Sequence, residues 1–231
     1  MSTSPIAAMF DRISPKYDAL NHLLSLNIDK VWRRKVAKAV AKSAPKTILD
    51  LATGTADLAI TMAKHNPQAH IIGTDISEKM LEIGKEKVKK HGFENQIDLR
   101  LGDATALPFW DDSFDAVTVA FGVRNFEDLQ KGLSEIHRIV KTGGQVAILE
   151  FSMPEKFPIK QLYILYFKHI LPIIGKIVSK DQSAYSYLPD SVEKFPKPND
   201  FINILFSHGL ENGTAKPLSF GIATLYAASK R

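Results

Sequence analysis

The spacing of hydrophobic positions changes near residue 46. Before that point, apolar residues recur at roughly three- and four-residue intervals from Leu20 to Val40, which predicts helices. Beyond it, short apolar runs alternate with amphipathic stretches. The runs predict strands at 47–51, 70–75, 96–101, 114–120 and 145–150, and the intervening stretches predict helices at 57–65, 77–90 and 127–139. This alternation is typical of a parallel, doubly wound α/β sheet of the Rossmann-like kind.

The alternation stops after Glu150. Residues 154–196 hold six prolines and glycines together with several tyrosines, and we expect a helical insertion over one end of the sheet. A helix at 198–209 and an antiparallel hairpin within 213–229 would complete a seven-stranded sheet. We therefore expect a single domain, 1–231, whose sections are an N-terminal helical cap (1–45), an α/β core (46–150), a helical lid insertion (151–196) and a C-terminal helix with closing strands (197–231).

Composition narrows the class of protein. The 231 residues are 45% hydrophobic and 24% charged, as in ordinary globular proteins. They contain no cysteine, which excludes a disulfide scaffold, a thiolate nucleophile and a cysteine-held metal. The first ten residues lack the basic and apolar regions of a secretory signal, so we expect a cytoplasmic location, with the inner face of the cytoplasmic membrane as an alternative.

The net charge of +5 is unevenly distributed. Residues 1–45 carry eight Lys and Arg against three Asp and Glu, residues 46–150 carry twelve against sixteen, and residues 151–231 carry ten against six. Basic flanks can be ordinary solvated helix faces, or they can face an anionic partner such as a membrane or a nucleic acid.

Three polar features follow predicted strands. Residues 50–57 read Asp-Leu-Ala-Thr-Gly-Thr-Ala-Asp, with Gly54 allowing close backbone approach to a ligand. Asp75 ends the second strand, where a carboxylate can accept both hydroxyls of a ribose. Asp103 and Ala104 follow the third strand, where they could contact the edge of an adenine. Since ligands bind at the carboxyl ends of such strands, the three features predict a nucleoside pocket.

The turn favours one nucleoside cofactor. A dinucleotide needs a loop of three glycines for its pyrophosphate, whereas only Gly54 is present here. Asp50 and Asp57 beside the turn would repel phosphate and would favour the cationic sulfonium of S-adenosylmethionine. The pattern resembles motif I of the class I S-adenosylmethionine-dependent methyltransferases.

Further motifs narrow the resemblance. The segments 9–21 (MFDRISPKYDALN), 121–125 (FGVRN), 138–144 (RIVKTGG) and 184–191 (AYSYLPDS) resemble the ubiquinone/menaquinone biosynthesis C-methyltransferase family over about Met9 to Ala228. Departures are small: Ala56 replaces a common second glycine, Thr142 replaces a proline, Ala120 stands where some members have serine, and residues 27–30 lack a histidine.

The resemblance implies methyl transfer from S-adenosylmethionine to a ring carbon of a polyprenylated quinol, demethylmenaquinol above all. By matching positions it implies that Thr55, Asp75, Asp103 and Ala104 bind the cofactor beside Gly54.

Carbon methylation needs an electron-rich ring, so the protein must orient the quinol, help to deprotonate it and exclude water. Arg124 is always charged and could stabilise a quinol oxyanion or order a water. Asn125 could hold that water, and Tyr17 could contact the quinol or close over the cofactor. We predict these three as catalytic residues; His137 and His169 are alternative bases. We expect no metal site.

Residues 157–178 are apolar, but three lysines and Pro172 make a membrane-spanning helix untenable. The segment is either a packed helix or an apolar lid for a polyprenyl tail that touches a membrane interface. We expect the quinol as partner and no nucleic acid, while peripheral membrane contact and a homodimer remain open.

Other functions stay open at this point. A class I methyltransferase could act on another small molecule or on a ubiquinone precursor. A nucleic-acid methyltransferase is disfavoured by the acidic middle section and the absence of a basic stripe. A binding module could keep the fold without the chemistry.

Overall fold

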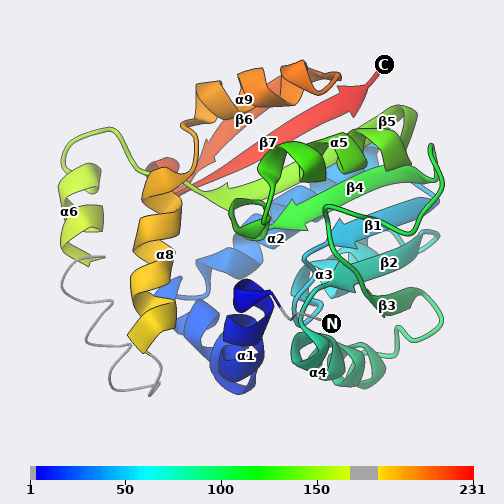
Figure 1. Ribbon diagram of the computed structural model, residues 1–231, viewed down its shortest axis with the longest axis horizontal. Helices are drawn as coiled ribbons and strands as arrows, with labels where there is room; N and C mark the ends of the chain where they lie inside the picture. The colour runs from blue at the N-terminus through cyan, green and yellow to red at the C-terminus, as the bar shows by residue number, and fades with distance from the viewer. Residues whose placement is uncertain (1–3, 167–181) are drawn as a thin grey trace.

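A seven-stranded sheet forms the centre of the structure, a computed structural model that describes residues 4–166 and 182–231. The strand order is β3-β2-β1-β4-β5-β7-β6. Neighbours among the first five are parallel, and β7 runs antiparallel to both β5 and β6. The predicted doubly wound seven-stranded sheet is confirmed (Figure 1). The strands are β1 (Thr47–Leu51), β2 (His70–Asp75), β3 (Ile97–Leu101), β4 (Phe114–Ala120), β5 (Val140–Phe151), β6 (Leu210–Leu218) and β7 (Ala223–Lys230).

Helices cover both faces of the sheet, each over its own apolar core. One core packs strand residues against α2 (Ile28–Val40), α3 (Asp57–His65) and α4 (Glu78–Lys90). The other packs them against α5 (Leu129–Ile139) and α9 (Pro198–Ser207). Both layers are required because a parallel sheet is apolar on its two faces.

The N-terminal helices reach the carboxyl ends of the parallel strands. Helix α1 (Pro5–Leu24) lies on that side in Figure 1, close to α4. Its Asp11 accepts a hydrogen bond of 2.6 Å from the Ser77 hydroxyl at the start of α4. Helix α2 buries Trp32 and Val36 in the sheet core. The cap is thereby attached to the same edge at which the motif I turn lies.

The closing hairpin begins at Leu210, three residues before the predicted stretch, and two boundaries around α5 also differ from the sequence prediction. Strand β5 begins at Val140 rather than near residue 145, because Val140 already pairs with Phe114 across an irregularity in register. The Gly143–Gly144 pair therefore lies within the strand and does not separate helix from strand. Helix α5 begins two residues later than predicted, since Asp128 caps it by accepting a hydrogen bond from the Lys131 N–H.

The insertion is helical where the structure describes it. Helices α6 (Ile159–Leu165) and α8 (Gln182–Lys194) stand beside the carboxyl ends of the central strands (Figure 1). Residues 167–181, with the candidate base His169, lie outside the described residues. Among the described residues, no helix combines the length and apolar character needed to cross a membrane.

Candidate active site

The chain turns sharply where β1 ends. Ala52, Gly54 and Ala56 all have positive φ, at 50°, 55° and 65°. Glycine adopts this conformation freely, whereas each alanine costs about 1 to 2 kcal/mol there. The Gly54 N–H donates a hydrogen bond of 2.8 Å to Oδ2 of Asp75. This bond ties the motif I turn to the end of β2.

Asp75 joins the turn to the next helix as well. Its Oδ1 accepts a 2.9 Å hydrogen bond from the Ser77 N–H. The side chain is buried, and burial raises the pKa of Asp75 to about 6, although its backbone hydrogen bonds oppose this shift. Because each carboxylate oxygen has a second lone pair, Asp75 can still accept two further donors, such as the hydroxyls of a ribose.

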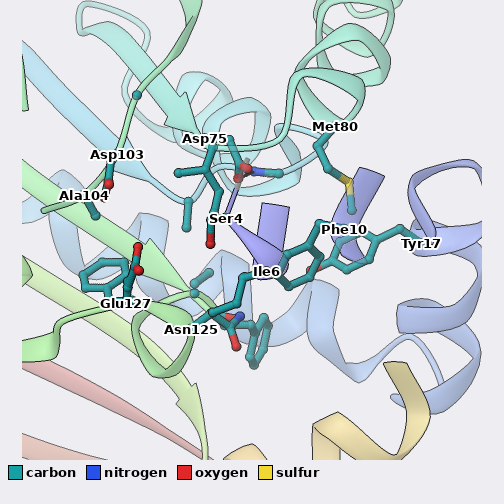
Figure 2. Close-up of a pocket in the computed structure, with 18 residues that line it drawn as sticks. Ser4, Ile6, Phe10, Tyr17, Asp75, Met80, Asp103, Ala104, Asn125 and Glu127 are labelled. Carbon is teal, nitrogen blue, oxygen red and sulfur yellow. Dashed lines mark hydrogen bonds between the residues drawn. The ribbon is translucent and has the colours of Figure 1, made fainter. Parts of the chain in front are cut away.

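A pocket opens at the carboxyl ends of the strands; we call it the carboxyl-end pocket (Figure 2). Its wall includes the carboxylates of Asp75, Asp103 and Glu127 and, among the described residues, no lysine or arginine. Such a pocket favours a cationic ligand over a pyrophosphate. The lining residues are Ser4, Ile6, Phe10, Tyr17, Ala52, Gly54, Asp75, Ile76, Met80, Gly102, Asp103, Ala104, Ala120, Phe121, Gly122, Asn125, Phe126 and Glu127.

Four of the five predicted cofactor residues line this pocket: Gly54, Asp75, Asp103 and Ala104. Asp103 accepts hydrogen bonds from the N–H and hydroxyl of Thr105, at 2.8 and 2.9 Å, which orders the loop after β3. The structure therefore brings these four together as expected.

Thr55 is placed differently. Its hydroxyl donates a 2.5 Å hydrogen bond to Asp18 and accepts one of 3.1 Å from Lys87. The residue is buried and does not line the pocket. Its hydrogen bonds with Asp18 and Lys87 instead stabilise the motif I turn.

An ion-pair cluster holds α1 and α2 against the motif I turn. Lys87 pairs with Asp18 at 2.6 Å and with Asp57, and Arg33 pairs with Asp29 and Asp57. Asp57 is paired with both cations and does not line the carboxyl-end pocket, so it does not face a cofactor there. His22, Asp29 and Asp57 lie close enough together to bind a metal ion, but the same two cations disfavour one.

Asp50 also departs from the expected role. Its carboxylate is buried beneath the turn and accepts 2.7 Å hydrogen bonds from the hydroxyls of Thr53 and Thr118. Burial raises the pKa of Asp50 to about 6. It supports the turn and does not line the carboxyl-end pocket.

The raised pKa makes a prediction for Asp50→Asn. A carboxyl whose pKa is higher in the folded than in the unfolded protein stabilises the fold at low pH, and this stability is lost as pH rises from about 4 through 6. Asn does not titrate, so the variant does not lose this stability as pH rises. The unfolding free energy of the variant minus that of wild type should therefore increase by about 3 kcal/mol between pH 3.5 and 7.5. Urea unfolding across this range measures it. Parallel pH profiles would contradict the prediction.

Arg124 lies on the short 3-10 helix η2 (Val123–Asn125) after β4, in a buried ion pair. Its Nη1 donates to Glu150 and to the Phe121 carbonyl, each at 2.6 Å, while Nε donates to Ser191 at 3.2 Å. Glu150 is fully buried. Among the described residues, Nη2 donates no hydrogen bond.

Asn125 and Tyr17 both line the carboxyl-end pocket, Arg124 lines the adjoining cavity, and His137 lines neither. Asn125 accepts a 2.9 Å hydrogen bond from the Tyr187 hydroxyl. Burial raises the pKa of the Tyr17 phenol, so Tyr17 is a hydrogen-bond donor at neutral pH and not a base. His137 lies against Gly209, near Asp112 and Lys230, and does not line this pocket, which removes it as a base.

Two further cavities lie next to the carboxyl-end pocket, one after the other. The second chamber shares Phe10, Tyr17 and Phe121 with it and also contains Arg124; its remaining lining is Met9, Ile13, Asn21, Ser25, Asp29, Arg33, Phe151, Tyr187 and Leu188. The apolar groove shares Asn21, Ser25, Phe151 and Leu188 with the second chamber and continues along Leu26, Ile28, Trp32, Ile159, Leu162, Tyr163, Tyr166, Phe220 and Ile222.

Gly122 allows η2 to lie against the motif I turn. A Cβ atom at this position would come within 2.4 Å of the Ala52 Cβ. We expect Gly122→Ala to displace the turn, to lower unfolding free energy by about 1 to 3 kcal/mol and to weaken cofactor binding at least tenfold. Calorimetric titration and urea unfolding measure both.

Gly102→Ala is the matched control for that substitution. Gly102 also lines the pocket, but its Cβ would meet Thr74 atoms at ordinary distances of 3.4 and 3.5 Å. Equal losses in the two variants would contradict the proposed contact with Ala52.

Comparison with known proteins decides the family. The family model described as the ubiE/COQ5 methyltransferase family matches residues 1–230. The chain belongs to this family. It is 49% identical to demethylmenaquinone methyltransferase of Bacteroides fragilis over 225 residues, covering 97% of this chain and 92% of the relative. It is 46% identical to the ubiquinone/menaquinone biosynthesis C-methyltransferase UbiE of Geotalea uraniireducens, covering 97% and 96%.

A solved structure supports the same fold. A Thermotoga maritima S-adenosylmethionine-dependent methyltransferase, described as a possible histamine N-methyltransferase, has a TM-score of 0.65 at 15% identity and covers 98% of this chain and 100% of its own. The chain is thus a class I methyltransferase that uses S-adenosylmethionine. The carboxyl-end pocket fits that cofactor, because its carboxylates favour a cationic ligand and the Asp75 carboxylate can accept hydrogen bonds from ribose hydroxyls.

Several pocket residues escaped sequence reasoning. Ser4, Ile6 and Phe10 come from the N-terminal segment and surround the pocket with Met80 and Glu127 (Figure 2). Glu127 follows η2 by two residues, so an acidic side chain after the fourth strand was an available signal. No local pattern indicates that the N-terminal segment reaches the pocket.

Proposed function

We propose that this enzyme transfers a methyl group from S-adenosylmethionine to a ring carbon of a polyprenylated quinol, converting demethylmenaquinol to menaquinol. One observation carries the proposal. The carboxyl-end pocket adjoins the second chamber with Arg124, with Tyr17 and Phe121 in the wall of both, and that chamber in turn adjoins the apolar groove. A polar ring with a long apolar tail matches this sequence of environments.

The apolar groove suits an isoprenoid tail. It encloses about 310 Å³, and its wall beyond the shared end is made almost entirely of aliphatic and aromatic side chains. Burying apolar surface stabilises binding by roughly 25 cal/mol for each Å², so a few isoprene units would contribute several kcal/mol. A small polar acceptor would gain nothing from this groove.

The residues around the ring site supply orientation and electrostatic stabilisation. When bound, S-adenosylmethionine supplies a methyl group already activated by its sulfonium. Arg124 is placed to stabilise the quinol oxyanion through Nη2, because removal of the hydroxyl proton drives electron density onto the ring carbon. Asn125 and Arg124 would hold the water that receives the proton. Tyr17 donates a hydrogen bond to the ring oxygens and separates the acceptor from solvent.

A methyl-transfer assay with the full chain tests the proposal. The acceptors are reduced short-chain demethylmenaquinol and a reduced short-chain benzoquinol precursor of the ubiquinone type, each with S-adenosylmethionine. We expect a product methylated on carbon, with higher kcat/KM on the naphthoquinol. Turnover on neither acceptor would overturn the proposal, and preference for the benzoquinol would replace the acceptor while keeping the chemistry.

We also propose that the enzyme works at the inner face of the cytoplasmic membrane, where such a quinol resides. The large side chains of Leu26 and Phe220, 77% and 80% exposed, stand beside the apolar groove, with exposed Lys156 and Lys160 on the neighbouring segment. Apolar residues flanked by lysines are typical of interfacial contact with anionic lipid.

The double variant Leu26→Ser/Phe220→Ser tests this contact. We expect wild-type enzyme to sediment with vesicles that contain anionic lipid, and the variant to lose at least tenfold of this binding because it offers less apolar surface. Trp110→Ser, at a site 89% exposed and outside the groove, is the control. Equal sedimentation of the double variant and wild type would contradict the assignment.

A further inference from the structure

Helix α8 contacts both side chains that we place at the ring site. Its Tyr187 hydroxyl donates a 2.9 Å hydrogen bond to Oδ1 of Asn125. Its Ser191 hydroxyl accepts a 3.2 Å hydrogen bond from Nε of Arg124. Two distant motifs, FGVRN and AYSYLPDS, therefore meet in space through these two bonds.

The same helix forms part of the acceptor site. Leu188 lines both the second chamber and the apolar groove. The Ser191 hydroxyl donates a 2.9 Å hydrogen bond to the Leu188 carbonyl. A tail in the groove would thus touch the turn of helix that holds Arg124 and Asn125.

The bond from Tyr187 to Asn125 and the bond from Arg124 to Ser191 differ in how much each restricts its side chain at the ring site. Arg124 has two further bonds, to Glu150 and to the Phe121 carbonyl, neither of which involves α8. Among the described residues, the Asn125 side chain has one further bond besides that to Tyr187, a 3.4 Å bond from its nitrogen to that same carbonyl. The orientation of the Asn125 amide therefore depends on Tyr187 more than the guanidinium depends on Ser191.

We propose that Tyr187 and Ser191 are positioning residues, and that α8 couples occupancy of the apolar groove to the orientation of Asn125 and Arg124. A tail packed on Leu188 holds α8 against η2, so the amide and guanidinium are fixed when the correct acceptor is bound. The inference rests on the proposed quinol acceptor. According to this inference, the tail of the acceptor raises kcat in addition to strengthening the binding of the acceptor.

Full-length wild type and Tyr187→Phe are compared on a prenylated naphthoquinol and on the same ring without a tail, at saturating S-adenosylmethionine. We expect wild type to show a higher kcat on the tailed acceptor. Tyr187→Phe should lower that kcat by tenfold to about a hundredfold, with KM and cofactor Kd changed less than about twofold. Its kcat on the tailless ring should stay near the wild-type value.

Matched variants separate positioning from loss of structure. Glu193→Gln changes an exposed residue of the same helix and should alter neither kcat. Ser191→Ala should show the same pattern as Tyr187→Phe with a smaller effect, and Ser191→Thr should restore the wild-type rate. Unfolding midpoints confirm that each variant folds.

The outcomes are distinguishable. Wild-type enzyme without turnover on any quinol would overturn the proposed function, and this inference with it. An active wild type with unchanged Tyr187→Phe kinetics, an effect confined to KM, or equal losses of kcat on both acceptors would overturn the inference alone.

Discussion

Asp75→Ala should weaken S-adenosylmethionine binding at least a hundredfold. The carboxylate holds the Gly54 N–H at 2.8 Å and has lone pairs left for the two ribose hydroxyls. Hydrogen bonds to a charged group contribute about 1.5 to 3 kcal/mol each, and 1.4 kcal/mol corresponds to a factor of ten in Kd. Isothermal titration measures the loss. Asp98→Ala, which removes a partly exposed carboxylate on β3, is the control and should bind normally.

The pH dependence of binding tests the same role independently. Since burial raises the pKa of Asp75 to about 6, the acceptor carboxylate is lost as pH falls below that value. Wild-type Kd should rise about tenfold for each pH unit below 6, and Asp75→Asn should bind weakly at every pH. A wild-type Kd that stays constant from pH 5 to 7 would show that Asp75 does not bind the ligand in its charged form.

The sheet and its ligand-binding edge could be predicted because local patterns determine them. Apolar runs of five to seven residues ending at Asp75 or before Gly54 identify parallel strands, and ligand sites in such sheets lie at their carboxyl ends. That one rule places Gly54, Asp75, Asp103 and Ala104 around a single pocket.

The supports of the site could not be predicted, because they depend on contacts distant in sequence. The position of Thr55 within motif I suggests a ligand contact, yet Asp18 and Lys87 hold its hydroxyl behind the turn. Asp57 similarly looks available until Arg33 is seen beside it. A charge pattern gives the residue types of such a cluster but not which of them pair.

The same ion-pair cluster attaches the N-terminal helices to the rest of the domain. Salt bridges from Asp18 and Asp57 to Lys87 join α1, α3 and α4 around the turn, while Phe10 and Tyr17 of α1 line the pocket. The helix that lines the pocket is thus attached to the elements that form the motif I turn. One basic residue of the first 45 positions, Arg33, serves in this attachment.

A single substitution of Arg124 would confound its ion pair with Glu150 and the role that we propose for it in the reaction. Arg124→Ala would leave Glu150 buried without its partner, which destabilises proteins by about 3 to 5 kcal/mol, so a loss of turnover would not distinguish chemistry from unfolding. The double variant Arg124→Gln/Glu150→Gln removes both charges together. It should therefore keep most of the stability while losing the donor to the oxyanion.

Arg124→Lys completes the comparison, because it keeps a cation beside Glu150 but lacks the forked Nη2 donors. Loss of one oxyanion donor lowers kcat by roughly a hundredfold to a thousandfold, and we expect this loss in both Arg124→Lys and the double variant, with S-adenosylmethionine Kd unchanged. Turnover of the reduced naphthoquinol, with unfolding midpoints of each protein, measures it. Full turnover in the double variant would show that the reaction does not need Arg124. The residue would then have only a structural role, in its ion pair with Glu150.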